Sequence, residues 1–163
     1  MLKDTLRITE IFYSLQGEGK TTGLPTTFIR LTGCPLRCGY CDTEYAFHGG
    51  ETWRIDDILQ EVGQLGAHYI NVTGGEPLAQ QRVHDLMKQL CDAGYHVSLE
   101  TSGALDVSTV DPRVFKVLDV KTPASGEVDK NRMDNFQYLT KQDQVKYVIC
   151  DHADYRGSAE HML

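Results

Sequence analysis

The stretch TTFIRLTGCPLRCGYC, residues 26–41, runs from a predicted β-strand straight into a loop with three cysteines. Its first six residues are β-branched, aromatic or aliphatic apart from one arginine, which is typical of a strand. The loop then spaces Cys34, Cys38 and Cys41 as C-x3-C-x2-C. Three thiolates bind a four-iron cluster incompletely, so one iron of such a cluster is left open for chemistry.

Two other uses of cysteine compete with an iron–sulfur cluster at this loop. A structural zinc site needs four protein ligands, and His48 is the nearest residue able to complete a Cys3His set. Disulfides are disfavoured because the chain has five cysteines and no recognisable secretory signal. Cys91 and Cys150 lie in apolar-patterned segments and are expected to be buried free thiols. The cluster is the favoured interpretation, and zinc stays open as the alternative.

Length and composition predict a single globular domain. A chain of 163 residues can bury one core but is too short for two ordinary domains, and its 40% hydrophobic and 24% charged residues are typical of a soluble protein. Acidic residues outnumber basic ones by 23 to 16, which disfavours a nucleic-acid partner. No apolar run approaches the roughly 20 residues that span a bilayer. We therefore expect a cytoplasmic protein with no membrane contact.

Strands and helices are expected to alternate along the chain. Apolar residues at helical spacing predict helices over 55–65 and 83–91. Strands are predicted over 7–13, 26–31, 68–72, 95–100, 114–120 and 144–149, with a helical turn or two over 133–139. This alternation predicts an α/β fold built from βαβ units, with a parallel sheet that is open or curled towards a barrel.

Polar residues cluster directly after four of the predicted strands. Besides the cysteines, these clusters are TGGEP at 73–77, ETSG at 100–103 and KTPAS at 121–125. Active sites on parallel sheets gather at the carboxyl ends of the strands, so we expect all four clusters on one face. The two adjacent glycines of TGGEP either simply turn the chain or let the backbone approach a ligand closely.

The cysteine loop resembles the signature of the radical S-adenosylmethionine (SAM) enzymes. In that family the amino and carboxylate groups of SAM chelate the open iron, and electron transfer into the sulfonium releases a 5'-deoxyadenosyl radical. Tyr40 matches the aromatic residue that the family places before its third cysteine, where it would pack near the adenine. The TGGEP stretch is similar to the family's GGEP motif, so the backbone at Gly75 would meet the amino group of SAM.

A narrower resemblance covers nearly the whole chain. The segment FYSLQGEG at 12–19, followed by Arg30, the CDT stretch at 41–43 and the three later clusters, resembles the 7-carboxy-7-deazaguanine synthases, abridged radical SAM enzymes of the deazapurine (queuosine) pathway. The resemblance implies an abridged partial (βα) barrel in a single radical SAM domain over residues 1–163. Because that family continues beyond the last predicted strand, the chain is expected to be shortened at its C-terminus.

The resemblance also implies an activity. The family is a radical SAM carbon–nitrogen lyase: 6-carboxy-5,6,7,8-tetrahydropterin loses ammonia, its ring contracts to 7-carboxy-7-deazaguanine, and SAM is regenerated. The implied cofactors are a [4Fe-4S] cluster, SAM and Mg2+. A flavodoxin-type or similar electron donor and a homodimer are the implied partners.

Site residues carry over by motif position. The pterin would be bound by Leu15, Gln16, Gly17, Glu18, Arg30 and Thr73. SAM would be bound by Tyr40, Cys41, Asp42, Gly75, Glu100, Lys121, Thr122 and Pro123, the cluster by Cys34, Cys38 and Cys41, and magnesium by Thr43. Arg30 would meet the substrate carboxylate with its planar fork. At Glu100 and at 121–125, polar turn residues without a ligand are an equal alternative.

Two other functions remain open. A glycyl-radical activase shares the cysteine spacing but acts on a protein, whereas the QGE stretch at 16–18, Arg30 and Thr43 favour a small polar substrate. A non-catalytic zinc domain would bind about one zinc and contain no acid-labile sulfide.

Overall fold

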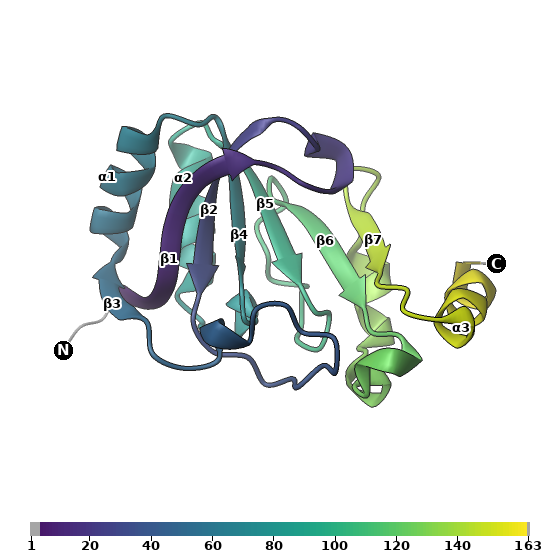
Figure 1. The fold of residues 1–163 in the computed structure, drawn as a ribbon. Helices are drawn as coiled ribbons and strands as arrows, with labels where there is room; N and C mark the ends of the chain where they lie inside the picture. Colours follow the sequence, from purple (N-terminus) through teal and green to yellow (C-terminus); the bar gives the residue numbers. More distant parts are fainter. Residues whose placement is uncertain (1–3, 163) are drawn as a thin grey trace.

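The strands predicted from the sequence are all present, and they lie in one sheet. In the computed structural model, which describes residues 4–162, this sheet has seven strands in the order β3-β1-β2-β4-β5-β6-β7. Five neighbouring strands are parallel: β2 (Pro25–Leu31), β4 (Tyr69–Gly74), β5 (His96–Thr101), β6 (Phe115–Val120) and β7 (Gln144–Tyr147). The sheet does not close, which confirms the expected α/β fold with a partial barrel (Figure 1).

Strands β1 (Thr5–Leu15) and β3 (Glu51–Arg54) correct the expectation of a wholly parallel sheet. β1 is antiparallel to both β2 and β3. Residues 16–24 connect β1 to β2, and this is too short for the crossover of a dozen or more residues that a parallel pair needs. β3 is a four-residue edge strand whose side chains are exposed except for Trp53. Without an apolar run, the sequence gives no signal for it.

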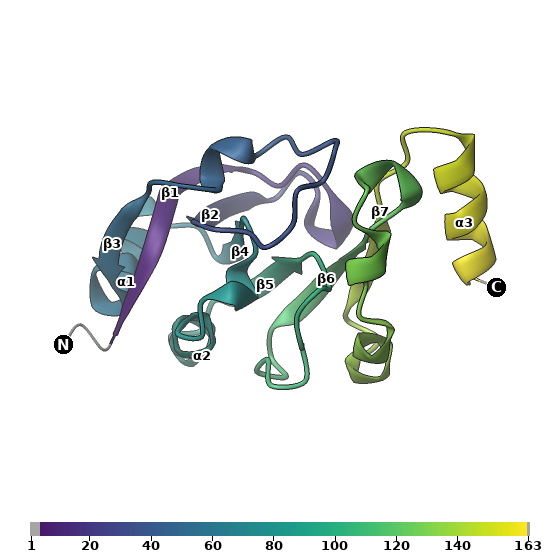
Figure 2. The same cartoon turned by 90° about the horizontal axis from the view of Figure 1, so that it is seen from below.

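Helices α1 (Ile55–Leu65) and α2 (Val83–Asp92) cover one face of the sheet (Figures 1 and 2). Asp56 and Asp57 lie in the first turn of α1, near the positive end of the helix dipole. The helix ends at Leu65, and the C-cap residue Gly66 adopts the left-handed conformation that favours glycine. The core between helices and sheet consists of large aliphatic side chains, among them Ile29, Ile58, Ile70, Leu86, Leu90 and Leu99.

Short 3-10 turns connect these elements. They are η1 (Gly19–Thr21), η2 (Glu44–Ala46), η3 (Pro77–Ala79), η4 (Pro123–Ser125), η5 (Val128–Lys130) and η6 (Met133–Tyr138). The last of these confirms the helical turn predicted over 133–139. No helix in the described part of the chain is both long and apolar enough to span a membrane.

Helix α3 (His152–Met162) is not predicted by the sequence, because its apolar residues form no stripe. Asp151 caps its first turn, accepting hydrogen bonds from two backbone N–H groups at 2.8 and 2.9 Å. Asp154 is fully buried and accepts hydrogen bonds from the N–H groups of Ala124 and Cys150, both at 2.9 Å. These polar contacts, and not an apolar face, hold α3 against η4.

The two cysteines outside the motif differ in exposure. Cys91 is half-buried and packs beside the core, close to the expectation of a buried thiol. Cys150 is exposed, so the expectation of a buried thiol there is wrong. Strand β7 ends at Tyr147, and Cys150 lies in the connection between β7 and α3.

The face of the sheet opposite the helices is crossed by two connections. The segment between β2 and β3 passes the carboxyl ends of the parallel strands (Figures 1 and 2). Residues 16–24 extend from β1 over the sheet towards β7 before returning to β2 (Figure 1). The two connections enclose the space in which the polar clusters meet.

Candidate active site at the cysteine loop

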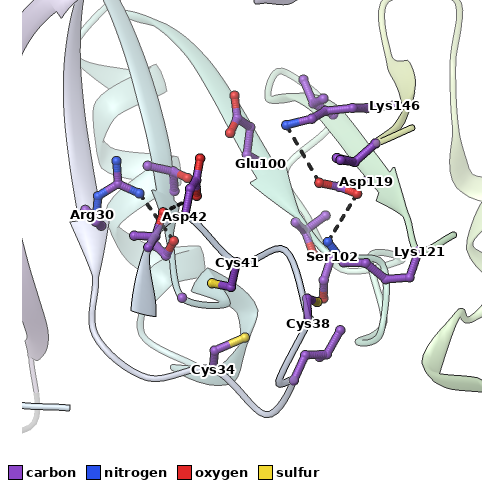
Figure 3. Close-up of a pocket in the computed structure, with 18 of the residues that line it drawn as sticks. Arg30, Cys34, Cys38, Cys41, Asp42, Glu100, Ser102, Asp119, Lys121 and Lys146 are labelled. Carbon is purple, nitrogen blue, oxygen red and sulfur yellow. Dashed lines mark hydrogen bonds and ion pairs between the residues drawn. The ribbon is translucent and has the colours of Figure 1, made fainter. Parts of the chain in front are cut away.

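The segments that follow β2, β4, β5 and β6 surround one pocket of about 330 Å3. Each of the four polar clusters contributes to its lining, so the expectation that they share one face is confirmed. Figure 3 shows the cysteines on one side of the pocket and charged side chains of both signs around the rest. The charged residues in the lining are Glu18, Arg30, Asp42, Glu100, Asp119, Lys121 and Lys146.

Cys34, Cys38 and Cys41 all line this pocket, and none is in a disulfide. Burial raises the pKa of the Cys34 and Cys38 thiols. Ligation must therefore displace protons, as it does at other thiolate sites. Within residues 4–162, no three His, Cys, Asp or Glu side chains form a ready-made metal site.

The donor chemistry of the loop nevertheless fits an iron–sulfur cluster. Three soft sulfur ligands come from one loop and line one cavity, and none of them is used in a disulfide. His48, the residue needed for a Cys3His zinc site, is exposed and does not line the pocket. The geometry therefore favours the cluster over zinc.

Gly75 lets β4 end directly against the cysteine loop. A Cβ at this position would lie 1.9 Å from the carbonyl oxygen of Gly33 and 3.2 Å from the nitrogen of Cys34. The same Gly33 oxygen accepts a hydrogen bond of 2.8 Å from the N–H of Glu76. Gly75 is thus required by the packing of the chain itself, in addition to any contact with a ligand.

Glu76 has a structural role that the sequence does not predict. Its carboxylate is fully buried and does not line the pocket. It accepts hydrogen bonds of 2.6–3.0 Å from the N–H of Leu78, the hydroxyl of Thr101, and both the N–H and the hydroxyl of Ser102. A carboxylate with this many donors fixes the end of β4 to the end of β5.

Arg30 lines the pocket and is paired in the structure with an acidic neighbour. Its Nε donates to Glu10 Oε1 at 2.7 Å, and the hydroxyl of Tyr45 donates to the same oxygen at 2.7 Å. One further N–H approaches the carbonyl oxygen of Gly74 at 3.4 Å. Glu10 is the register partner of Arg30 across β1 and β2. The guanidinium is therefore oriented by the chain while part of its fork stays available to an anion in the pocket.

A row of alternating charges crosses the opposite side of the pocket. Lys121 Nζ lies 3.1 Å from Asp119, and Lys146 Nζ lies 2.7 Å from Glu18 and 3.7 Å from Asp119 (Figure 3). Burial lowers the pKa of Lys121, but the nearby Asp119 carboxylate together with the Cys38 and Tyr40 side chains outweighs this, and the net shift is upwards. Both lysines are therefore cationic at neutral pH.

Glu100 lies deeper on the same face. Its Oε1 accepts a hydrogen bond of 3.0 Å from the amide of Asn71, whose own oxygen is buried without a hydrogen-bond partner. Burial raises the pKa of the Glu100 carboxyl. A carboxylate and an amide oxygen here can both accept from N–H donors of a bound ligand.

Asp42 and Thr43 add oxygen ligands near the cysteines. The Thr43 hydroxyl donates to Asp42 Oδ1 at 2.6 Å, and both residues line the pocket. Hydroxyl and carboxylate oxygens are the donors that magnesium prefers.

The structure brings together most of the site residues expected from the sequence. Those that line the pocket are Gln16, Glu18, Arg30, Cys34, Cys38, Tyr40, Cys41, Asp42, Thr43, Thr73, Gly75, Glu100 and Lys121. Leu15, Gly17, Thr122 and Pro123 do not line it. Leu15 is 61% exposed, whereas the buried Thr122 uses its hydroxyl to bond the Val148 carbonyl at 2.8 Å.

Four pocket or support residues are missed by the motif-based analysis: Glu10, Asn71, Asp119 and Lys146. Asn71, Asp119 and Lys146 lie inside strands, whereas the recognisable polar motifs of the sequence follow the strands. The alternation of side chains between the two faces of a strand is the signal that could find them. In β4, for example, Asn71 points to the face opposite that of the buried Ile70 and Val72. A polar side chain within an apolar strand indicates the face opposite the helices.

Comparison with known proteins agrees with this site. The family model of the radical SAM superfamily matches residues 28–119, which is more than half of the chain. The crystal structure of QueE from Escherichia coli superposes with a TM-score of 0.82 at 26% identity, over 97% of this chain and 77% of that one. Fold and site thus define a radical SAM protein.

Relatives with higher sequence identity identify the family within this superfamily. The 7-carboxy-7-deazaguanine synthase of Koribacter versatilis is 46% identical over 157 residues, which are 95% of this chain and 70% of the relative. The enzyme of the same name from Chlorobaculum tepidum is 44% identical over 153 residues, with 92% and 70% covered. The chain belongs to the 7-carboxy-7-deazaguanine synthase family of the radical SAM superfamily.

Proposed function

We propose that this chain is a radical SAM lyase that forms 7-carboxy-7-deazaguanine, the product after which its relatives are named. In this proposal 6-carboxy-5,6,7,8-tetrahydropterin loses ammonia and its ring contracts, as a step of deazaguanine and queuosine biosynthesis. The observation that carries the proposal is that three free thiols and charged side chains of both signs line one and the same pocket.

In the proposed complex, Cys34, Cys38 and Cys41 hold a [4Fe-4S] cluster. Bound together, the cluster and SAM supply the one-electron chemistry of the superfamily. Tyr40, Asp42, Gly75, Glu100 and Lys121 are the proposed neighbours of SAM. The ammonium of Lys121 lies 5.9 Å from the centre of the Tyr40 ring. An aromatic face and a cation on one side of the pocket suit a ligand with a flat base and a carboxylate.

The proposed substrate site lies beside the SAM site in the same pocket. Gln16, Glu18, Arg30 and Thr73 line it. The backbone of Leu15 and Gly17, which do not line the ligand-free pocket, is proposed as a further contact of the pterin. Arg30 and Thr73 are register partners on β2 and β4, so both reach the same depth. The free part of the Arg30 fork suits the substrate carboxylate, and the carboxylate and amide of Glu18 and Gln16 suit the polar edge of a pterin.

We also propose a magnesium site, a domain organisation, binding partners and a cellular location. Mg2+ would bind at Thr43, and the adjacent Asp42 oxygen supports this assignment. The relatives' family also leads us to propose one domain, a homodimer, a flavodoxin-type or similar electron donor and a cytoplasmic location. Thr122 and Pro123 are left out of the SAM site because they do not line the pocket.

Anaerobic reconstitution with iron and sulfide tests the proposal. The reconstituted chain is incubated with SAM, a strong reductant, Mg2+ and carboxytetrahydropterin. We expect a product with deazapurine absorbance and one ammonia for each product formed. About one zinc per chain without labile sulfide would instead indicate a structural metal domain.

Cysteine variants locate the cluster. We expect Cys34→Ser, Cys38→Ser and Cys41→Ser each to lose SAM cleavage, because each removes one thiolate from a loop with no spare sulfur. Cys91→Ser is the matched control, since Cys91 lies on α2 away from the pocket. Normal iron content in all three loop variants would place the cluster elsewhere.

A further inference from the structure

Residues 16–24, here called the strap, are bonded to the far edge of the sheet. The Lys20 ammonium donates to the carbonyl oxygens of Lys141 and Gln142 at 3.2 and 2.8 Å. The Lys20 N–H donates to the side chain of Gln144 at 2.9 Å. The strap begins at β1, and these contacts lie next to β7, five strands away in the sheet order. It therefore spans the open face of the sheet.

Lys146 makes the contact between β7 and the strap that faces the interior. Its ammonium lies 2.7 Å from Glu18 of the strap and 3.7 Å from Asp119, its register partner on β6. Burial lowers the pKa of Lys146, but the hydrogen bond to Glu18 and the nearby carboxylates of Asp119 and Glu100 outweigh this and raise it. The Lys146 ammonium thus pairs with Glu18 and is attracted to two further carboxylates, Asp119 and Glu100.

A second hollow of about 280 Å3 lies under the strap and shares Gln16, Glu18, Glu100, Val117 and Lys146 with the first pocket. Glu18 is therefore at the junction of the two spaces. An unpaired glutamate side chain on a connecting loop has several rotamers, and only some of them point into the pocket. The contact with Lys146 selects among them.

Stability is a weak explanation for this ion pair. The Lys146 and Glu18 side chains are 28% and 46% exposed. Ion pairs with this much solvent contact contribute little to folding. The position of the pair at the pocket points to orientation of Glu18 as its main effect.

We propose that Lys146 is a positioning residue that holds the Glu18 carboxylate in the orientation that binds substrate. The inference rests on the proposed function, in which Glu18 contacts the pterin. Lys146 acts through Glu18 and is not itself a catalytic residue. Its removal should weaken substrate binding more than it slows turnover at saturating substrate.

The test compares Lys146→Met with Lys146→Arg and with Lys88→Met in the reconstituted full chain. Lys88 forms an exposed ion pair of 2.8 Å with Asp92 on α2, away from the pocket, so it controls for loss of a lysine. We expect Lys146→Met to raise the dissociation constant for carboxytetrahydropterin about tenfold. Lys146→Arg should recover most of the affinity, and Lys88→Met should match the parent. Hydrogen exchange of residues 16–24 should be faster in Lys146→Met without ligand.

A double-mutant cycle separates the indirect role from a direct one. On a Glu18→Gln background, Lys146→Met should change the pterin affinity by less than about twofold, because the group it positions is altered. Equal effects on both backgrounds would show that Lys146 acts independently of Glu18 and would overturn the proposal. Unchanged affinity in Lys146→Met, while the parent binds and turns over the pterin, overturns it too. Should Lys146→Met fail to fold, Lys146→Gln takes its place with the same expected results. A parent that neither binds nor converts the pterin refutes the proposed function itself.

Discussion

At the carboxyl end of β2, Arg30 has more N–H groups than the structure pairs. Glu10 and the Gly74 carbonyl occupy two of its five, and Tyr45 strengthens the arrangement by bonding to the same Glu10 oxygen. Two carboxylates therefore share one guanidinium if the substrate binds as proposed. A planar fork can meet both at once, whereas an ammonium is a point charge without fixed directions.

Arg30→Lys is expected to weaken pterin binding by one to two powers of ten, about 1.4 to 2.8 kcal/mol. A lysine at position 30 would pair with Glu10, which lies 2.7 Å from the present Arg30 Nε, and its shorter reach would leave the pocket without its donor. Equilibrium binding of carboxytetrahydropterin measures the effect. Iron content and SAM binding should stay near those of the parent.

Arg54→Lys is the matched control for this variant. Arg54 forms an exposed pair of 3.0 Å with Asp56 beside the edge strand β3, and the same substitution there should leave pterin affinity unchanged. Loss of iron in Arg30→Lys with unchanged pterin affinity would instead assign Arg30 to support of the cysteine loop.

At the scale of elements, the approach of β4 to the cysteine loop depends on a single glycine. The strand passes Gly74 and Gly75 and bonds back to Gly33 through the N–H of Glu76. The Glu76 carboxylate then accepts a hydrogen bond from the N–H of Ser102, directly after β5. The TGGEP stretch thus positions three loops relative to one another before any ligand is bound.

Gly75→Ala is expected to destabilise the ligand-free chain by about 1–3 kcal/mol, the usual cost of overpacking. The added Cβ would lie 1.9 Å from the Gly33 carbonyl oxygen, so the cysteine loop must move away. Urea unfolding without iron or SAM measures the effect. Gly157→Ala in α3 is the control, because its Cβ would meet nothing within 4 Å and alanine favours a helix. Equal stability of the parent and Gly75→Ala would leave ligand contact as the reason for Gly75.

The sequence predicts the elements whose apolar residues have a clear period and misses those held by polar contacts. Helix α1 and the parallel strands follow from their patterns, whereas α3 depends on Asp151 and Asp154 and has no apolar stripe. The antiparallel course of β1 follows from a connection length that the strand pattern does not reveal. In the site, motif positions find the cysteines, but Asp119 and Lys146 acquire their role only when β6 and β7 pair.

Across the whole molecule, the pocket depends on contacts between segments far apart in the chain. Asp154 of α3 bonds the N–H of Ala124, and the neighbouring Ser125 carbonyl accepts from the N–H of Gly39 in the cysteine loop at 2.9 Å. The other long-range support is the buried ion pair of Lys116 and Asp143, whose side chains are 4% and 0% exposed. This pair joins β6 to the start of β7, the strand that carries Lys146.

Asp143→Asn is expected to destabilise the chain by about 3 kcal/mol, because it leaves the Lys116 ammonium buried without its charge partner. Lys116 Nζ lies 3.1 Å from Asp143, and the carboxylate also accepts from the N–H groups of Lys116 and Thr140 at 2.6 and 2.7 Å. Burial raises the pKa of Asp143, but these hydrogen bonds and the ammonium outweigh it and lower the pKa below its ordinary value. Urea unfolding at neutral pH measures the loss.

The pH dependence gives the sharper form of this prediction. Because the pKa of Asp143 is lower in the folded chain than in the unfolded chain, where it is about 3.9, its stabilising effect is complete at neutral pH. The effect is lost as the pH falls below about 4 and through the folded pKa, since the folded chain must then take up a proton at a site that favours the anion. The parent and Asp143→Asn should therefore differ most at pH 7 and converge in acid.

Asp92→Asn, in an exposed ion-pair network on α2, should differ little from the parent at neutral pH. A constant difference between the parent and Asp143→Asn down to pH 2 would show that the carboxylate charge is not what holds β7 in place.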